Sequence, residues 1–228
     1  MSSPADGHEP VTTAASEPTR AERRGRATAD TRAAILAAAR ACLLADGYAN
    51  LSTRAVAEAA DVPLSQIHYH FGSKQQLILE VLAAENARLL DRQRGLFGGD
   101  EPLWRQWEQA CAYLDDDLRS GYVRVLNELV AAAWSDPELA AAVRELIGGW
   151  FGLLGDVARR VAEQRGGLGP FTPEEIGALM GLPFVGAEPM LLLGFDEEAL
   201  PARTALRKIG AVIRLFEEGT VSMPQGDA

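Results

Sequence analysis

The residues whose types could do chemistry are concentrated between Leu64 and Lys74, where the chain reads LSQIHYHFGSK. If this segment is helical, Ile67 and Phe71 lie one turn apart on the buried face. The remaining side chains are then exposed, and most are polar or aromatic groups that can reach DNA phosphates and base edges. The exposed set is Leu64, Ser65, Gln66, His68, Tyr69 and His70.

The first three residues of this set are the best candidates for reading bases. They open the helix, and the first residues of a recognition helix contact base edges in the major groove of DNA. Gln66 can pair with adenine, and Leu64 can touch a thymine methyl group.

Other chemistries fit these residues poorly. His68 and His70 are two residues apart, so on a helix they diverge by about 200°, and no thiol or carboxylate stands at metal-ligand spacing. The only other histidine is His8, which leaves no plausible Ser/His/Asp or Cys/His set. The glycine-rich segment 166–170 follows no strand and is therefore not a phosphate loop. We expect no metal, no cofactor and no enzymatic activity.

Three helices must position this segment, and the first is the longest of them. Either Asp30 or Thr31 can cap its start, and Gly47 can close its end. Its apolar face consists of Ile35, Ala39 and Leu43.

The second helix covers about residues 52–60 and the third about residues 64–71, with a break at Asp61–Pro63 and an end at Gly72. Two short helices that close across such a turn form a helix-turn-helix. The second helix of that motif fits the major groove of DNA.

The net charge of −10 argues against nucleic-acid binding on its own, but the charge is unevenly distributed. Basic residues outnumber acidic ones over residues 20–74, whereas acidic residues dominate residues 75–228. Salt screens charges beyond about 8–10 Å, so a basic end can bind phosphate despite an acidic body. The excess of bases is small, and ordinary scatter would also explain it.

The 228 residues divide into four parts. Residues 1–29 have the composition of a disordered arm. Residues 30–76 form the helix-turn-helix domain, residues 77–220 a helical domain for ligand binding and dimerisation, and residues 221–228 a tail. The arm ends in an arginine cluster that is either a solvated tail or a DNA-touching arm. That cluster is Arg20, Arg23, Arg24 and Arg26.

The helical periodicity continues to residue 218, so the fold class is all-α. No alternating strand pattern of useful length occurs. Pro183 and Pro189 should kink or break the penultimate helix. Helices are expected at residues 75–97, 102–119, 121–134, 137–165, 173–193 and 202–218.

The apolar runs are much shorter than the ~20 residues that a membrane span needs. Residues 1–19 lack the apolar core of a secretory signal. Cys42 and Cys111 are far apart and lack metal-ligand spacing, which excludes a disulfide scaffold and a zinc module. We therefore expect a cytoplasmic protein.

Several aromatic side chains in the acidic part can line a cavity for a small molecule, although each is also a candidate for the core. These are Trp104, Trp107, Tyr113, Trp134, Trp150 and Phe184.

Polar residues inside apolar runs are better indicators of a cavity. Asn127 lies in VLNEL, and Glu188 lies in FVGAEPM. A buried carboxylate needs a partner. For Glu188 that partner is either a basic ligand or an internal arginine such as Arg124, unless the carboxylate is exposed.

Residues 31–77 resemble the DNA-binding domain of the TetR family of transcriptional regulators. The positions in register with the family pattern are Val56-Ala57, Val62, Tyr69-His70-Phe71 and Lys74. The resemblance implies that Thr53, Arg54, Tyr69, His70 and Lys74 contact phosphates. A simple helix cap and a solvated arginine are the alternatives for Thr53 and Arg54.

Three positions depart from the family pattern. Asp61 stands where the family usually has glycine, but Asp tolerates the left-handed conformation better than most residues. Pro63 replaces a Ser or Thr cap, and His68 stands where the family often has tyrosine.

The resemblance implies a homodimeric repressor that binds a palindromic operator and is released by a small, largely apolar ligand. It also implies that the last two helices pair with their mates in a four-helix bundle. An apolar stripe serves this bundle or the core, namely Leu206, Ile209, Val212, Ile213 and Phe216. The alternative is a helical adaptor or enzyme that carries a helix-turn-helix without regulating an operator.

Overall fold

The computed structural model describes residues 19–219. The predicted tail at 221–228, and the predicted arm as far as residue 18, lie outside the described residues. Within them the structure holds nine helices and no strand, so the predicted all-α class is confirmed. The helices are α1 (Arg20–Asp46), α2 (Thr53–Ala59), α3 (Leu64–Phe71), α4 (Lys74–Phe97), α5 (Leu103–Ser120), α6 (Tyr122–Ala133), α7 (Pro137–Arg165), α8 (Pro173–Leu192) and α9 (Ala202–Glu217).

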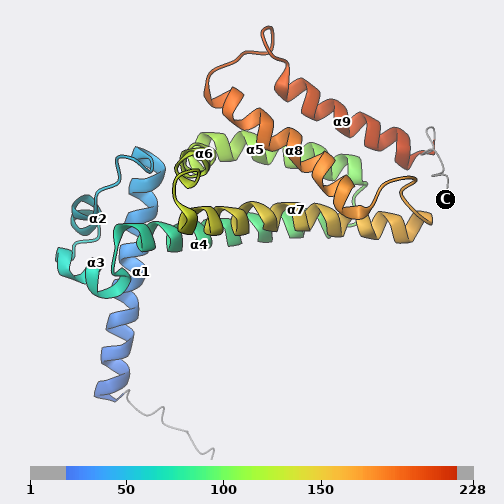
Figure 1. The fold of residues 1–228 in the computed structure, drawn as a ribbon. Helices are drawn as coiled ribbons and strands as arrows, with labels where there is room; N and C mark the ends of the chain where they lie inside the picture. Colours follow the sequence, from blue (N-terminus) through green and yellow to red (C-terminus); the bar gives the residue numbers. More distant parts are fainter. Residues whose placement is uncertain (1–18, 220–228) are drawn as a thin grey trace, which may run out of the picture.

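The helices form two parts that share one long helix (Figure 1). The short helices α2 and α3 lie against α1 at one end of the molecule, and α4 runs from there into the second part. In the second part α7 lies beside α4, α8 packs along α7, and α9 packs on α5 and α8. The predicted boundary at residue 76 therefore falls inside the first turn of α4.

The structure corrects the predicted start of the first helix. Residues 20–29 are helical, so they do not belong to a disordered arm, and Asp30 and Thr31 lie inside α1 instead of capping it. The segment RAERRGRATAD is rich in Arg and Ala, which favour helix. It also extends a helix that is already held by buried Ile35 and Leu43, so the costly first turn is not needed again.

Two clusters of buried apolar side chains make up the core. The first joins α1, α2 and α3 to the first half of α4 and also to α6 and α7, with Ile67 and Phe71 inside it as predicted. The second joins the end of α4 to α5, α8 and α9. Because the first cluster includes Val125 and Leu129 of α6, the helix-turn-helix packs directly on the second part.

The two prolines do not break α8, which continues from Pro173 to Leu192. Each proline removes one N–H donor and so frees the carbonyl four residues earlier, that of Leu179 or Val185. Leu179 is exposed, so water can solvate its carbonyl.

Close packing against α7 holds α8 in place. A Cβ at Gly177 would lie 2.8 Å from the Gly155 nitrogen, and one at Gly181 would lie 2.5 Å from Cε1 of Phe151. Among residues 19–219, α8 is the one helix whose length and composition would suffice to cross a membrane. Its small residues are used for helix packing, and Glu188 lies within it.

Candidate nucleic-acid interface and internal cavity

The turn between α2 and α3 fixes the angle between the two helices. The N–H of Val62 donates to the Ala57 carbonyl (3.0 Å), and the N–H of Asp61 donates to the Glu58 carbonyl (3.1 Å). This pair of bonds is a Schellman motif, which needs a left-handed residue after the helix. Asp61 takes that position with φ of 53° and is the one non-glycine residue with positive φ in the described chain.

Buried apolar side chains orient α3 so that its polar side is outward. Ile67 and Phe71 are buried, and Gly72 ends the helix with φ of 72°. Tyr69 is 75% exposed, which is a high value for an aromatic side chain that has no partner molecule to cover it. Ser65 and His68 are also exposed.

The other predicted DNA contacts surround this helix. Leu64 is exposed, whereas Gln66 and His70 are half-buried. The rings of Tyr69 and His70 meet edge-on with centroids 5.0 Å apart. His68 Nδ1 lies 3.3 Å from the Gly72 carbonyl oxygen.

Helix ends bring three more predicted residues to this region. Thr53 and exposed Arg54 occupy the first turn of α2, after Ser52. Lys74 begins α4 and its Nζ lies 5.9 Å from the centroid of the Tyr48 ring. Helix N-termini attract phosphate, so these positions suit an anionic backbone. That each residue contacts DNA stays a prediction.

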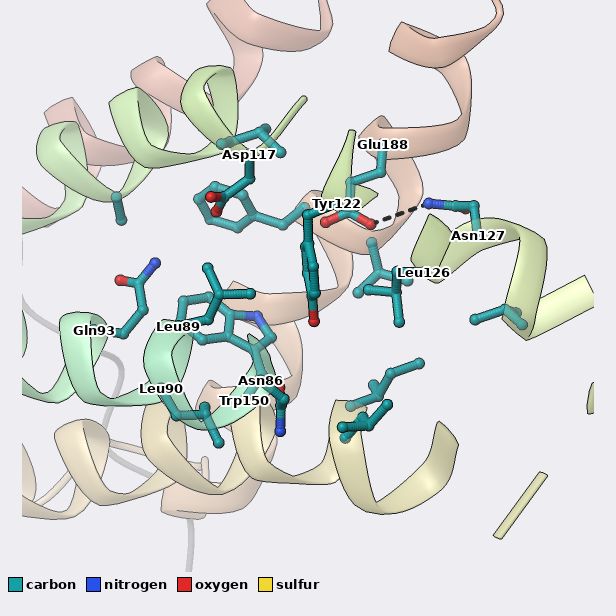
Figure 2. Close-up of a pocket in the computed structure, with 17 residues that line it drawn as sticks. Asn86, Leu89, Leu90, Gln93, Asp117, Tyr122, Leu126, Asn127, Trp150 and Glu188 are labelled. Atoms are coloured by element: carbon teal, nitrogen blue, oxygen red, sulfur yellow. Dashed lines mark hydrogen bonds between the residues drawn. The ribbon is translucent and has the colours of Figure 1, made fainter. Parts of the chain in front are cut away.

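A cavity of about 170 Å³ lies among α4, α5, α6, α7 and α8 (Figure 2). Four of the predicted ligand residues line it: Asn127, Trp150, Phe184 and Glu188. The walls are mostly apolar side chains, including Leu89, Leu90, Leu114, Leu126, Val130 and Leu146. Polar lining residues that the sequence did not indicate are Asn86, Gln93, Asp117 and Tyr122.

The structure does not bring the other four predicted ligand residues to this cavity. Trp107 is buried in the core, where its Nε1 donates to the Leu206 carbonyl (2.7 Å) and its ring meets Phe184. Tyr113 packs under the Arg92 guanidinium at 4.2 Å. Trp104 lies between the guanidinium groups of two arginines, Arg105 and Arg214. Trp134 is 83% exposed at the end of α6.

Glu188 is a half-buried acid in the cavity, and desolvation by the surrounding side chains raises its pKa to about 7. The hydrogen bond from Asn127 Nδ2 (3.4 Å) lowers this pKa, and the negative charge of Asp117 raises it. Arg124 is not its partner, because that guanidinium donates to the carbonyls of Leu44 (2.7 Å) and Ala45 (3.1 Å).

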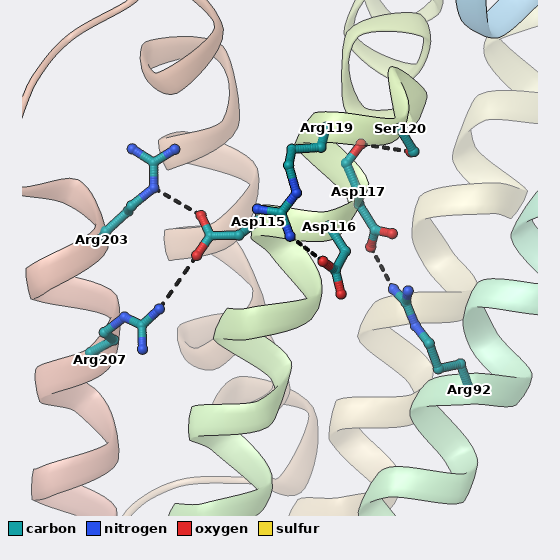
Figure 3. A network of polar contacts seen from close by, with 8 residues as sticks. All are labelled: Arg92, Asp115, Asp116, Asp117, Arg119, Ser120, Arg203 and Arg207. Carbon is teal, nitrogen blue, oxygen red and sulfur yellow. Dashed lines mark hydrogen bonds and ion pairs between the residues drawn. The ribbon is translucent and has the colours of Figure 1, made fainter.

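Asp117, by contrast, has a cation beside it (Figure 3). Arg92 Nη2 lies 2.5 Å from its Oδ2. Burial raises the pKa of Asp117, and the bond from Arg92 opposes that rise. On the other side of α5, Asp115 accepts from Arg203 (2.8 Å) and Arg207 (3.3 Å), which ties α5 to α9.

This arrangement of helices is similar to that of known proteins. Residues 35–81 match the model of the family described as bacterial regulatory proteins, tetR family. No match was found among curated proteins. The chain has the fold of TetR-family transcriptional regulators. The resemblance predicted from the helix-turn-helix residues is therefore confirmed.

Solved structures agree with this family over most of the chain. Escherichia coli NemR in its reduced form has 20% identity and a TM-score of 0.63, covering 80% of this chain and 97% of NemR. A TetR transcription regulator from Haloarcula marismortui has 18% identity and a TM-score of 0.66, covering 81% and 98% of the two chains. A transcriptional regulator from Rhodococcus sp. Rha1 has 21% identity and a TM-score of 0.63, covering 82% and 96%.

In this chain, α6 contacts both the cavity and the helix-turn-helix. Leu126 and Asn127 line the cavity. On the same helix, Arg124 holds the end of α1, and Glu128 accepts from the N–H of Tyr48 (2.5 Å) just after that end.

The long helix α4 makes a second connection of this kind. Asn86 and Leu89 line the cavity. The adjacent Glu85 is buried and accepts from Arg40 Nε of α1 (2.7 Å), with Arg88 bound to the same oxygen. Both α4 and α6 therefore contribute residues to the cavity and bind α1.

Proposed function

We propose that the chain is a one-component repressor that binds a palindromic operator as a homodimer in the cytoplasm. A small, largely apolar molecule in the cavity releases it from DNA. The observation that carries this proposal is that α4 and α6 each contact both the cavity and α1. One chain would therefore hold a ligand site that is connected through two helices to the domain with the exposed recognition helix.

The DNA-binding half of the proposal rests on α3. Its exposed N-terminal residues suit the major groove, and two such helices related by a two-fold axis would read half-sites about 34–36 Å apart. Phosphate contacts from Arg54, Tyr69 and Lys74 would fix the register without reading sequence.

The homodimer is supported by apolar side chains that α8 and α9 leave exposed. Val212 is 65% exposed although its neighbours in the predicted stripe, Leu206 and Ile209, pack into the core. Three leucines on these helices are exposed as well: Leu179 and Leu182 on α8, and Leu215 on α9. An apolar patch of this kind on a soluble protein marks an interaction surface.

Release follows if the ligand binds better to a conformation with the two recognition helices displaced. Coupling free energies between sites are about 1–3 kcal/mol, which weakens operator binding about 5–150-fold. The ion pair between Arg40 and Glu85 and the bonds from Arg124 to α1 would carry the displacement.

Selection of bound duplexes from a random pool tests the operator. The expected consensus is an inverted repeat with half-site centres one helical turn or a multiple apart. Light scattering should give a dimer near twice 24.5 kDa. A monomer, or a pool without consensus, would contradict the proposal and favour the adaptor.

A matched pair of variants tests the DNA face. Tyr69→Ala should weaken binding to operator and to unrelated duplexes alike, because a phosphate contact carries no sequence information. Phe171→Ala removes another exposed aromatic side chain, in the turn between α7 and α8 at the far end of α7 from the helix-turn-helix (Figure 1), and should leave both affinities unchanged. Equal affinities for wild type and Tyr69→Ala in a gel-shift titration would refute the contact.

A further inference from the structure

The polar groups of the cavity are unbalanced in charge. Its lining includes two carboxylates, Asp117 and Glu188, and no Lys, Arg or His among the described residues. The remaining polar lining groups are the amides of Asn86, Gln93 and Asn127, the Tyr122 hydroxyl and the Trp150 indole N–H. The charges that a ligand meets are therefore all negative, and they are set in apolar walls.

The two carboxylates differ in what neutralises them. Asp117 has the Arg92 guanidinium at 2.5 Å, and Arg92 also lies over the Tyr113 ring. Glu188 has no cation within 4 Å among residues 19–219, and its hydrogen-bond partner is the neutral amide of Asn127. The one arginine on α6, Arg124, is committed to carbonyls at the end of α1.

A second acceptor in the cavity lacks a donor. Gln93 lines the cavity and is 8% exposed, and its Oε1 accepts no hydrogen bond. Buried polar atoms without a partner are rare in native proteins and mark places where a ligand or water completes the bonding. Glu188 and Gln93 thus offer two acceptor positions in one cavity.

We propose, on the basis of the ligand response proposed above, that the cavity binds a small aromatic or aliphatic amine. The protonated nitrogen of this amine binds the Glu188 carboxylate. The cation would supply the charge that this half-buried carboxylate lacks, and its remaining N–H groups can donate to neighbouring acceptors. The apolar body would pack between Trp150, Phe184 and Leu126, which face the cavity.

The cavity volume limits the size of the amine. A cavity of about 170 Å³ is close to the ~150 Å³ that holds benzene. One ring with a short chain therefore fits. A neutral alcohol of the same shape keeps the apolar contacts and loses the ion pair, and a carboxylate adds repulsion from Glu188.

Three probes of one shape separate these contributions: 2-phenylethylammonium, 2-phenylethanol and phenylacetate. Calorimetric titration at pH 8 into the full-length protein should give the tightest binding for the ammonium and the weakest for the carboxylate. Glu188→Gln should weaken ammonium binding about tenfold or more, the value of one charge-assisted hydrogen bond. The same variant should leave 2-phenylethanol binding within about twofold, which also shows that its cavity is intact. Glu108→Gln, which removes an exposed carboxylate of α5, is the matched control and should change nothing.

The outcomes distinguish this inference from the proposed function. Equal affinities for the ammonium and the alcohol, or an unchanged ammonium affinity in Glu188→Gln, would overturn the amine assignment. Release of operator DNA by 2-phenylethanol would still support the ligand response. Tight ammonium binding that leaves the operator complex intact would support the amine assignment and contradict the proposed release.

Discussion

Glu188→Gln should stabilise the protein at alkaline pH and do little at acid pH. The substitution keeps the shape of the side chain, so the apolar walls and the contact with Asn127 are preserved. It removes the charge of a carboxylate that burial disfavours, since the pKa of Glu188 is raised from 4.5 to about 7. The protein without DNA or ligand is the species to compare.

The sign and size follow from the linkage between protonation and folding. A group whose pKa is raised in the folded state stabilises it below the unfolded pKa, and this contribution is lost as the pH rises through the folded value. For Glu188 the loss occurs between pH 4.5 and about 7. At 1.36 kcal/mol per pH unit, the full loss is on the order of 3 kcal/mol, of which about 2.5 falls between pH 5 and pH 8. Glutamine has no such loss.

Urea unfolding of both proteins at pH 5 and pH 8, at one protein concentration, measures this difference. Asp117 and Tyr122 face the same cavity, and Arg92 is paired with Asp117, but all three are identical in both proteins and their titrations largely cancel. The advantage of the variant should grow by about 2.5 kcal/mol from pH 5 to pH 8. An advantage that is constant with pH, or that shrinks, would refute the claim that Glu188 is desolvated without a cation.

Substitutions at three further positions test the turn and the core of the helix-turn-helix and the junction between α5 and α6. Asp61→Gly should raise the free energy of unfolding by about 1 kcal/mol, because glycine adopts a φ of 53° without strain. Asp61→Val should lower the free energy of unfolding. Equal stabilities of the two variants in urea titration would contradict backbone strain at this position. Gly121→Ala should lower the free energy of unfolding by about 2 kcal/mol or more, because φ is +85° and the new Cβ would lie 2.6 Å from the Leu44 carbonyl oxygen. An unchanged thermal midpoint would show that the backbone between α5 and α6 can move to accommodate the Cβ. Ile67→Ala should cost about 2–5 kcal/mol, because this side chain is buried behind α3; a smaller loss, measured by denaturant unfolding, would mean that α3 is loosely held.

The sequence was sufficient for most helices because their apolar periodicity coincides with clear end signals. Ser73 caps α4 by accepting from the Gln76 N–H, and Thr172 forms a capping box at the start of α8 with Glu175. The start of α1 escaped prediction because residues 20–29 have no apolar face. Helix propensity alone carries that segment, and it produces no periodic signal.

The cavity could be predicted only in part, for a physical reason. Glu188 and Asn127 were found because a polar residue inside an apolar run is conspicuous, whereas Asn86 follows Glu85 in a mixed stretch. Gln93 gives no such signal, because it lies between arginines in a polar stretch. Whether an aromatic residue faces the cavity depends on how α5, α6 and α8 cross, which local sequence does not encode. Trp134 is the clearest example, because it was expected in the cavity and is exposed to solvent.

The short path from cavity to DNA-binding domain follows from helix geometry. Successive residues on a helix point about 100° apart, so one turn can present one side chain to the cavity and the next to α1. Glu85 and Asn86 do this on α4. On α6, Asn127 lines the cavity and Glu128 accepts from the N–H of Tyr48, two residues after α1 ends. A shift of either helix therefore moves a cavity wall and an α1 contact together. Both helices hold the same end of α1, so shifts of α4 and α6 in opposite directions would strain that end. The proposed ligand response therefore requires α4 and α6 to move in one direction, which would displace α1 together with α2 and α3.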